Sequence, residues 1–340
     1  MRSFGGATIL VFGGAGFIGS NFIRQVLSQS RKAKVICVDV LTYAGNRDNL
    51  RGLPAGRFIF IKGNITDSVH MKRIFKKYAP SYVINFAAES HVDRSIHGRA
   101  LDFFRTNVEG AAVLFEIGRT MPGLKKFVHV STDEVYGSLS LSSKKKFNER
   151  SPLAPSSPYA ASKASADLAA HAYNMTYGLP IVITRCSNNY GPYQHPEKLI
   201  PYSILRLMEK KPIAIYGDGR YVRDWIHVED HCSALVLALL DGVPGEIYNI
   251  GADDEVDNLT LAKSMLAYFN KNESAIAFVK DRPGHDRRYA IDASKIRKEL
   301  GWKPKRSFKT SFGPTVVWYI ENSAWVHRAL ARAGGANTHI

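Results

Sequence analysis

A glycine-rich turn near the amino terminus constrains the fold more than any other feature of the chain. Thr8–Phe12 is an apolar stretch typical of a buried strand, and it leads directly into Gly13, Gly16 and Gly19. Residues 20–27 then have helical character. Glycines at these positions permit a tight turn and let backbone N–H groups at a helix start approach a pyrophosphate. The segment therefore predicts a βαβ unit that binds a dinucleotide.

The end of the next apolar strand indicates which dinucleotide this is. Lys34–Asp39 closes on an acid that lies 20 residues after Gly19. A carboxylate there accepts a hydrogen bond from a ribose 2′-hydroxyl and repels a 2′-phosphate. A glycine trio alone is weak evidence, but strand, glycines, helix and spaced acid together are specific. The predicted cofactor is NAD rather than NADP.

The same alternation of strands and helices continues along the chain. Further strands are expected at 57–62, 82–86, 126–131 and 181–185, with helical patterns between most of them. This order is typical of an α/β protein with a Rossmann-type, doubly wound parallel sheet. Loops rich in Pro and Gly after Arg185 predict a smaller α/β substrate-binding lobe, and a strand expected at 246–250 returns to the sheet and makes that lobe discontinuous. The expected division is 1–187 plus 226–251 for the NAD-binding Rossmann domain, 188–225 plus 252–332 for the lobe, and 333–340 for a frayed tail.

Composition excludes several classes of protein. The 340 residues contain no apolar run of the roughly 20 needed to span a bilayer and no amino-terminal signal pattern. The three cysteines, Cys37, Cys186 and Cys232, are too widely spaced for a metal or redox motif, so no metal and a cytoplasmic location are expected. The net charge of +16 raises the possibility of nucleic-acid binding, but the basic residues are scattered and even the densest run, 144–146, is typical of a solvated loop. We expect neither a nucleic acid nor a membrane as partner, and part of the positive charge is available to an anionic substrate.

Five polar residues form the predicted catalytic cluster. Thr132, Asp133 and Glu134 follow the strand at 126–131, at the edge where open α/β sheets place their ligands. Tyr159 and Lys163 are four residues apart, so a helix presents both on one face. A lysine beside a tyrosine favours phenolate and lowers the pKa of the phenol, which gives a base near neutral pH. The two acids suggest a second proton transfer.

These residues also carry a resemblance to a known family. The glycine turn, the Tyr159–Lys163 pair and the overall length resemble the extended short-chain dehydrogenases/reductases. More specifically, the chain resembles the nucleotide-sugar 4,6-dehydratases, and among these the enzymes acting on dTDP-glucose. The specific strings are residues 87–93 (AAESHVD), 131–137 (STDEVYG), 188–193 (NNYGPY), 196–201 (PEKLIP), 223–225 (RDW) and 281–288 (DRPGHDRR).

The resemblance implies a chemical role for each member of the cluster. Tyr159 takes the proton of the sugar 4-hydroxyl as hydride passes to NAD, with Lys163 and Thr132 beside the phenol oxygen. Glu134 then takes the proton of carbon 5, and Asp133 protonates the departing 6-hydroxyl. Hydride then returns to carbon 6 and a proton to carbon 5, which leaves a 4-keto-6-deoxy sugar. Adjacent carboxylates suit this chemistry because like charges raise one pKa and keep an acid beside a base.

The resemblance also implies binding residues. The cofactor positions are Gly13, Gly16, Phe17, Ile18, Gly19, Asp39, Thr42, Asn64, Ile65, Ala87, Ala88, Ser90, Thr106, Asn107, Tyr159, Lys163 and Asn189. The sugar-nucleotide positions are Ser90, Thr132, Asn188, Lys198, Leu199, Ile215, Tyr216, Arg223, Asn258, Arg282 and His285. The chain departs from the family pattern at Asn64, Phe12 and Ala214, where the family has mostly Asp, Thr and Pro, and none of these positions touches the chemistry.

Several alternatives remain open from the sequence. A UDP-sugar 4-epimerase or decarboxylase shares the fold and NAD, although such relatives mostly lack the acid pair, and a non-catalytic NAD-binding regulator is the alternative from another class. UDP, dTDP and CDP sugars differ by contacts worth only about 1–3 kcal/mol. Glu89, His91 and Asp93 fit either a catalytic role or a hydrogen-bonded cluster. His227, Asp230 and His231 fit a structural turn better than a metal site. Asn107 fits either support of Lys163 or packing of its helix.

A homodimer is also expected. Extended reductases of this kind pair two helices from each subunit, and the candidates here are 103–119 and Pro158–Tyr177. Both contain small or apolar residues at close spacing, which lets helices approach one another. These residues are Val108, Ala111, Ala112, Phe115, Ala161, Ala164, Ala166, Leu168 and Ala169.

Overall fold

The computed structural model describes residues 3–281 and 283–332 and has at its centre a seven-stranded sheet. The strand order is β10-β6-β5-β4-β1-β2-β3, and every neighbouring pair is parallel. The strands are β1 (Thr8–Phe12), β2 (Lys34–Asp39), β3 (Phe58–Lys62), β4 (Tyr82–Asn85), β5 (Lys126–Thr132), β6 (Ile181–Cys186) and β10 (Ile247–Ile250). The predicted strands agree with these to within a residue at each end, and the doubly wound parallel sheet is confirmed.

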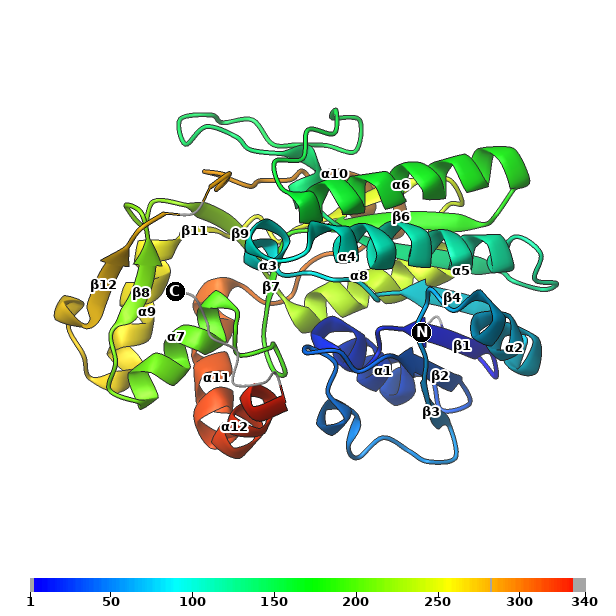
Figure 1. Ribbon diagram of the computed structural model, residues 1–340, viewed down its shortest axis with the longest axis horizontal. Coiled ribbons are helices and arrows are strands. Elements are labelled where there is room, and N and C mark those ends of the chain that lie inside the picture. Colours follow the sequence, from blue (N-terminus) through cyan, green and yellow to red (C-terminus); the bar gives the residue numbers. More distant parts are fainter. Residues whose placement is uncertain (1–2, 282, 333–340) are drawn as a thin grey trace.

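Helices cover both faces of this sheet (Figure 1). Val11, Phe22 and Leu235 belong to the core on one face, under α1 (Phe17–Gln29), α8 (Val228–Asp241) and α10 (Ser294–Leu300). Phe12 and Leu114 belong to the core on the other face, under α2 (Ser68–Tyr78), α5 (Ala111–Gly118) and α6 (Pro158–Tyr177). Both faces of each central strand are therefore buried, which explains why these strands are continuous apolar runs.

The smaller lobe lies at one end of the sheet, on the left in Figure 1. It contains two small sheets, one with the order β11-β9-β7 and one pairing β12 with β8. Their strands are β7 (Asn188–Tyr190), β8 (Ile213–Tyr216), β9 (Val222–His227), β11 (Glu255–Asp257) and β12 (Ile276–Val279). The helices are α7 (Leu199–Met208), α9 (Asn258–Leu266), α11 (Phe308–Glu321) and α12 (Ser323–Arg332), which share one apolar core. The exact domain boundaries stay a prediction, and the tail at 333–340 lies outside the described residues.

The helix expected at 103–119 is interrupted. α4 (Ala100–Phe104) continues into a π-helical turn over Arg105–Gly110 before α5 begins, and the short α3 (Val92–His97) precedes α4. A π-helical turn accommodates an extra residue, and such turns occur mostly at functional sites. Here the turn contains Thr106 and Asn107, two of the predicted cofactor residues.

No helix within 3–281 and 283–332 combines the length and the apolar character needed to cross a membrane.

A buried ion pair joins α6 to the sheet. Asp167 accepts a hydrogen bond from Nε of Arg185 on β6 at 2.8 Å, and both side chains are buried. Arg185 also donates through Nη1 to the hydroxyl of Tyr136, which donates in turn to Asn249 on β10. These contacts therefore link α6, which carries Tyr159 and Lys163, to β6, to the turn that contains Tyr136 and to β10.

Arg185→Leu is expected to lower the free energy of unfolding by about 3–5 kcal/mol, because it leaves the buried Asp167 carboxylate without its partner. Urea unfolding measures the loss. Adding Asp167→Asn to this variant should recover part of the stability, since the uncompensated charge is then removed. Lys211→Met, which breaks the exposed pair with Glu209, should cost less than about 1 kcal/mol and serves as the control. Equal losses in the two single variants would contradict the role of burial.

Candidate active site

A cavity of about 370 Å³ opens at the carboxyl ends of the central strands. Turns that follow β1, β2, β4, β5 and β6 line it, as expected for an open α/β sheet. It gathers the predicted residues Gly13, Gly16, Phe17, Ile18, Gly19, Asp39, Thr42, Asn64, Ile65, Ala87, Ala88, Ser90, Thr106, Thr132, Asp133, Glu134, Tyr159, Lys163, Asn188, Asn189 and Lys198. The predicted cofactor and catalytic residues thus lie together, while their individual roles remain predictions.

The glycine turn provides a cradle that side chains would fill. Gly13 has a φ of +71°, and a Cβ on it would lie 2.5 Å from the backbone nitrogen of Ala87. A Cβ on Gly19 would lie 2.5 Å from the carbonyl oxygen of Gly13. Helix α1 follows, with Gly16 as its N-cap residue and no acidic residue in its first turn. Its amino-terminal N–H groups and the positive end of its dipole therefore favour an anion. The turn therefore fits the pyrophosphate of a dinucleotide.

Asp39 joins this turn to the loop after β2. Its Oδ2 accepts from the backbone N–H of Ala15 at 2.9 Å, and its Oδ1 accepts from that of Leu41 at 2.8 Å. Burial raises the pKa of the Asp39 carboxyl, and these two hydrogen bonds oppose that shift. Because Asp39 also lines the cavity, it is positioned to meet the ribose hydroxyls, as predicted for NAD.

The acid pair lies directly after β5, where the chain turns into a short 3-10 helix, Asp133–Tyr136. The Thr132 hydroxyl accepts a hydrogen bond from the backbone N–H of Glu134 and donates one to Oδ1 of Asp133 at 3.3 Å. Asp133 is buried, and its pKa is raised well above the ordinary value, first by burial and then by the negative charges of Glu134 and Asp224. The raised pKa favours the protonated form of Asp133, which lies beside the more accessible Glu134.

Tyr159 and Lys163 lie on the same face of α6, which begins at the N-cap Ser157. The prediction of a Tyr159 phenol with a lowered pKa is wrong for this structure. The pKa of Tyr159 is raised, first by burial and then by the negative charge of Glu134, although a hydrogen bond with Thr132 opposes the shift. The Lys163 ammonium instead donates to the carbonyl of Val130 at 2.8 Å, and burial lowers its pKa to about 8.

The side-chain hydrogen bonds of Asn107 go to Glu89 and Ser162 rather than to Lys163. Its amide accepts from the N–H of Glu89 at 2.8 Å, and donates to the carbonyl of Glu89 at 3.0 Å and to the hydroxyl of Ser162 at 2.8 Å. It thereby joins the segment after β4 to α6. Its neighbour Thr106 lines the cavity, so the π-helical turn supplies one lining residue and one positioning residue.

Several lining residues were not assigned from the sequence. They are Cys186, Gln194, His195 and Glu197, together with Glu89, for which two interpretations were open. Glu197 is buried, its pKa is raised by burial, and it lies 3.6 Å from Arg94 and 3.9 Å from His91. In the sequence Glu197 directly precedes Lys198, an assigned residue of the string 196–201. This adjacency is the sequence signal that could have identified Glu197.

Six of the predicted sugar-nucleotide residues do not line this cavity in the described part of the chain. They are Leu199, Ile215, Tyr216, Arg223, Asn258 and His285, whereas Arg282 lies outside the described residues. Arg223 donates to the carbonyl of Asp286 at 2.9 Å and covers the ring of Tyr289. The His285 ring stacks on Tyr221 with centroids 3.6 Å apart. The lobe thus holds these residues in a second group next to the lined space.

The three residues that resembled a metal set are engaged in structural contacts. His227 caps the start of α8. Asp230 accepts from the backbone N–H groups of Lys305 and Arg306, and His231 lies 2.8 Å from the amide oxygen of Asn189. These contacts support the structural interpretation.

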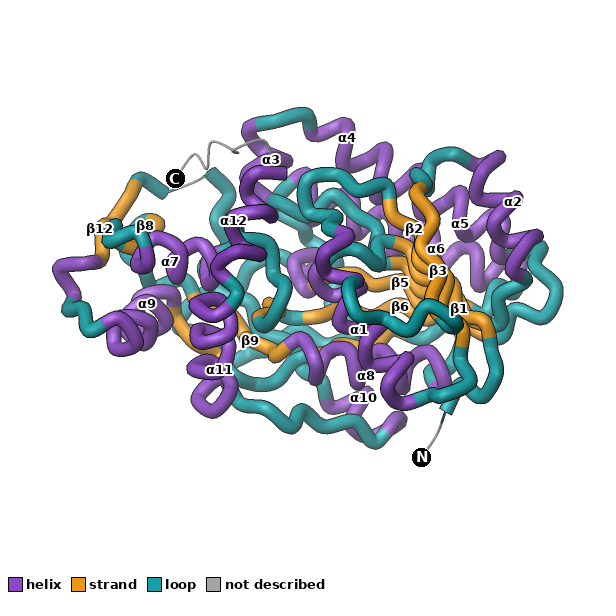
Figure 2. Tube along the Cα trace, turned by 90° about the horizontal axis from the view of Figure 1, so that it is seen from below, coloured by secondary structure: helices purple, strands orange, loops and turns teal. Residues whose placement is uncertain are grey.

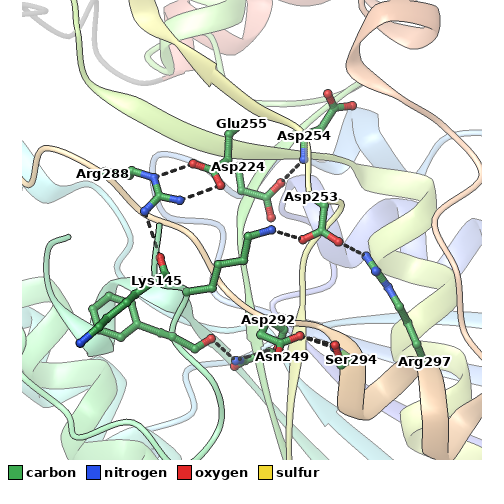
Figure 3. Close-up of polar contacts among 12 residues, drawn as sticks. Lys145, Asp224, Asn249, Asp253, Asp254, Glu255, Arg288, Asp292, Ser294 and Arg297 are labelled. Atoms are coloured by element: carbon green, nitrogen blue, oxygen red, sulfur yellow. Dashed lines mark hydrogen bonds and ion pairs between the residues drawn. The ribbon is translucent and has the colours of Figure 1, made fainter. Parts of the chain in front are cut away.

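A network of ion pairs and hydrogen bonds surrounds Arg288 and Asp253 (Figure 3). Arg288 forms two hydrogen bonds to Glu255, at 2.6 and 2.9 Å, and donates to the carbonyl of Lys145. Asp253 is bound by both Lys146 and Arg297. The network joins the 138–151 segment, which leads toward Tyr159, to the lobe.

Asp224 is the buried carboxyl of this region (Figure 3). Its Oδ1 accepts from the N–H of Asp254 at 2.8 Å, and burial raises its pKa to about 6. Its charge contributes to the raised pKa of Asp133. The negative charge of Asp224 therefore favours the protonated form of Asp133.

Comparisons with known proteins agree with this geometry. The family model described as GDP-mannose 4,6 dehydratase matches residues 10–313. A dTDP-glucose 4,6-dehydratase of Xanthomonas campestris is 47% identical over 342 residues, covering 95% of this chain and 96% of the relative. The dTDP-glucose 4,6-dehydratase DesIV of Streptomyces venezuelae, solved with NAD bound, superposes with a TM-score of 0.90 at 47% identity over 95% of this chain and 99% of that one. A UDP-glucose 4-epimerase of Thermotoga maritima reaches a TM-score of 0.85 at 30% identity over 93% and 99%.

Asp224→Asn is expected to raise the free energy of unfolding relative to the parent protein. This gain should grow as the pH rises. The folded-state pKa of about 6 exceeds the ordinary value of 3.8, so ionisation of Asp224 costs stability as the pH rises through this interval, and the cost is complete above pH 6. Between pH 5 and pH 8 the stability difference between variant and parent should grow by about 1 kcal/mol in urea unfolding.

The control for this measurement is Asp218→Asn. Hydrogen bonding to Arg287 lowers the pKa of Asp218 to about 2, below its ordinary value, so its contribution to stability is present above pH 4 and is lost only in stronger acid. Its effect should be constant between pH 5 and pH 8. A pH-independent effect of Asp224→Asn would contradict the raised pKa.

Proposed function

The chain belongs to the GDP-mannose 4,6 dehydratase family, and we propose that within this family it is an NAD-dependent hydro-lyase that converts dTDP-glucose to dTDP-4-keto-6-deoxyglucose. The reaction oxidises carbon 4, eliminates water across carbons 5 and 6, and returns the hydride to carbon 6. It is a step of deoxysugar biosynthesis.

The observation that carries this assignment is the buried acid beside a base in the same cavity as Tyr159 and Lys163. Oxidation at carbon 4 alone needs one base, whereas elimination also needs a proton acceptor at carbon 5 and a proton donor at the 6-hydroxyl. The raised pKa of Asp133 favours its protonated form, and Glu134 is its adjacent carboxyl partner. The site therefore has one more acid–base pair than an oxidation or an epimerisation requires.

Each side chain has a distinct task in this proposal. Tyr159 acts as a phenolate, whose negative charge is stabilised by the Lys163 ammonium held at the carbonyl of Val130. It becomes a neutral phenol when its oxygen accepts the proton of the 4-hydroxyl. Thr132 hydrogen-bonds the same oxygen. Glu134 takes the proton from carbon 5, and Asp133 gives its proton to the leaving hydroxyl. In the return step Glu134 gives its proton back to carbon 5. The proton that Tyr159 took from the 4-hydroxyl then balances the one that Asp133 gave to the departing water, so exchange with solvent restores both groups.

NAD is the cofactor, and when bound it supplies a reversible acceptor for the hydride of carbon 4. The glycine cradle, Asp39 and the loop that follows it are the residues that would hold it. Asn188 and Lys198, together with Arg223 and His285 of the lobe, are proposed to hold the sugar nucleotide. The positive side chains among them suit a diphosphate.

Incubation of the enzyme with dTDP-glucose labelled with deuterium at carbon 4 tests the function. Deuterium should appear in a new methyl group at carbon 6, and in heavy water one solvent deuteron should enter carbon 5. Parallel incubations with UDP-glucose and CDP-glucose measure selectivity for the base. Formation of dTDP-galactose without any methyl signal would favour the epimerase instead.

Glu134→Gln is expected to lower turnover about 100- to 10,000-fold, because it removes the base that takes the proton from carbon 5. Oxidation at carbon 4 should persist and be visible as reduced cofactor absorbance on the enzyme. Exchange of the carbon-5 proton with solvent should be lost, as NMR in heavy water would reveal. Wild-type turnover would refute the assignment of Glu134.

Asp133→Asn is the matched variant for that experiment, since it removes a transferable proton at nearly constant volume. Its defect should depend on the leaving group at carbon 6 and be relieved with a 6-fluoro substrate, whose leaving group needs less protonation. Glu134→Gln should gain no such relief. Equal defects with both substrates would mean that Asp133 only positions the sugar.

A homodimer is the proposed assembly, although the structure alters the expected contact surface. Ala111, Phe115, Ala164 and Ala166 are buried within the chain. The exposed apolar residues are instead Leu101 and Phe104 on α4, and Leu168, Met175 and Tyr177 on α6. α4 and α6 pack against each other, so these residues offer an apolar surface that a second copy can cover. The cytoplasmic location likewise remains a prediction.

Leu168→Glu is expected to weaken the dimer at least about tenfold, because Leu168 is 62% exposed and would place a charge in the apolar contact. Sedimentation over a range of concentrations measures the dissociation constant. Val243→Glu, at an exposed valine after α8, should leave association unchanged. A fully active monomer of the unaltered chain at micromolar concentration would contradict the proposed dimer.

A further inference from the structure

We propose that α12, the last helix of the lobe, positions the cofactor-binding loop at 40–49 and thereby slows release of NAD. This inference rests on NAD being the cofactor. Val40, Thr42, Ala44 and Gly45 of the loop line the cavity on the side of Asp39. In Figures 1 and 2, α12 lies between α11 of the lobe and the amino-terminal domain.

A chain of two hydrogen bonds joins α12 to the glycine turn through the side-chain amide of Asn49. The indole Nε1 of Trp325 donates to Oδ1 of Asn49 at 2.9 Å, and both side chains are buried. The amide nitrogen of Asn49 donates in turn to the carbonyl of Ala15 at 2.9 Å. The backbone N–H of Asn46 donates to the same carbonyl at 3.0 Å. Trp325 is thus two hydrogen bonds away from the turn that meets the pyrophosphate.

A second contact neutralises a buried carboxylate in the loop. Asp48 lies 3.1 Å from Nε of Arg328 and 3.4 Å from Nη2 of Arg332, both on α12, and 2.9 Å from Nη2 of Arg51. Burial acts to raise the pKa of Asp48, but the guanidinium groups outweigh it and the pKa is lowered. Without Arg328 and Arg332, the negative charge of Asp48 would be less well neutralised, beside a site that binds an anion.

The same helix also braces the opposite wall of the cavity. The Trp325 ring packs against Tyr193, with centroids 5.8 Å apart. On the neighbouring α11, the Tyr319 hydroxyl is 3.0 Å from the carbonyls of Gly191 and Gln194, and Gln194 donates to the carbonyl of Asn189. Gln194 and Asn189 line the cavity. The α11–α12 pair therefore contacts both the cofactor loop and the segment after β7.

These contacts have a kinetic consequence. The space between loop and helix is closed to about 10 Å³, with Tyr43, Asn46 and Asn49 on one side and Trp325 and Ala329 on the other. The loop cannot move outward without breaking the Trp325–Asn49 bond and the arginine contacts of Asp48. Movement of the loop to release NAD must therefore break those contacts. In a reaction that regenerates its cofactor, slow release keeps NAD in place between turnovers.

Two variants test this positioning role. Trp325→Phe removes the indole donor and keeps an aromatic ring, and Arg328→Gln removes one charge from Asp48. Each is expected to speed dissociation of NAD about tenfold, the effect of one hydrogen bond of this kind. Dissociation is measured without any sugar nucleotide. An excess of a competing adenine dinucleotide is added to the enzyme with NAD bound, and the rate at which NAD leaves is followed. Hydrogen exchange of the amides at 40–49 in the cofactor-free protein should rise, while turnover at saturating NAD should change less than twofold.

Matched variants separate positioning from general destabilisation. Arg328→Lys keeps the charge and should restore slow release in part. Lys263→Met breaks a distant exposed pair with Glu273 in the lobe and should change neither release nor exchange. Unchanged NAD release and unchanged exchange at 40–49 in both Trp325→Phe and Arg328→Gln would overturn the proposal. Because these measurements need no sugar, they are independent of whether dTDP-glucose is the substrate.

Discussion

The buried ion pair between Asp167 and Arg185 holds α6 against β6, and the arrangement of the catalytic side chains depends on it. Two opposite charges in the protein interior are stable only when each remains close to its partner. Their pairing therefore restrains the helix one turn below Lys163 and two turns below Tyr159. The Lys163 ammonium, bound to the carbonyl of Val130, adds a second link between the same helix and β5. Tyr159 is thus placed beside Thr132 by contacts to two strands rather than by the helix alone.

Burial then divides the titratable groups of the cavity between two tasks. Removal from water raises the pKa of Asp133 and of the Tyr159 phenol. The nearby negative charges of Glu134 and Asp224 act in the same direction on Asp133. Lys163 is affected in the opposite sense, and its pKa of about 8 leaves it mostly charged near neutrality. Acid and base functions therefore coexist at one pH because the site differs in polarity and charge over a few residues.

The lobe contributes more to the site than a second set of binding residues. Glu197 and Lys198 reach the cavity from the segment before α7, where Lys198 donates to the carbonyl of Ser90. Arg288 and Asp253 hold the 138–151 segment that precedes α6. At the other end, α12 contacts the cofactor loop through Trp325 and Arg328. Both walls of the cavity are consequently attached to the lobe, which couples its position to the shape of the cofactor site.

The sequence by itself determined the parallel sheet, the glycine turn, the choice of NAD and the cluster of Thr132 to Glu134 with Tyr159 and Lys163. These features depend on local periodicity and on short spacings, which a single strand or helix expresses directly. Only the tertiary structure decided the direction of the Tyr159 pKa shift, because burial and the charge of Glu134 come from distant segments. It also decided that the hydrogen bonds of Asn107 go to Glu89 and Ser162, because these partners come from two other segments, the one after β4 and α6. The inclusion of Glu197 and the role of α12 arise in the same way, from long-range contacts and desolvation that no local pattern encodes.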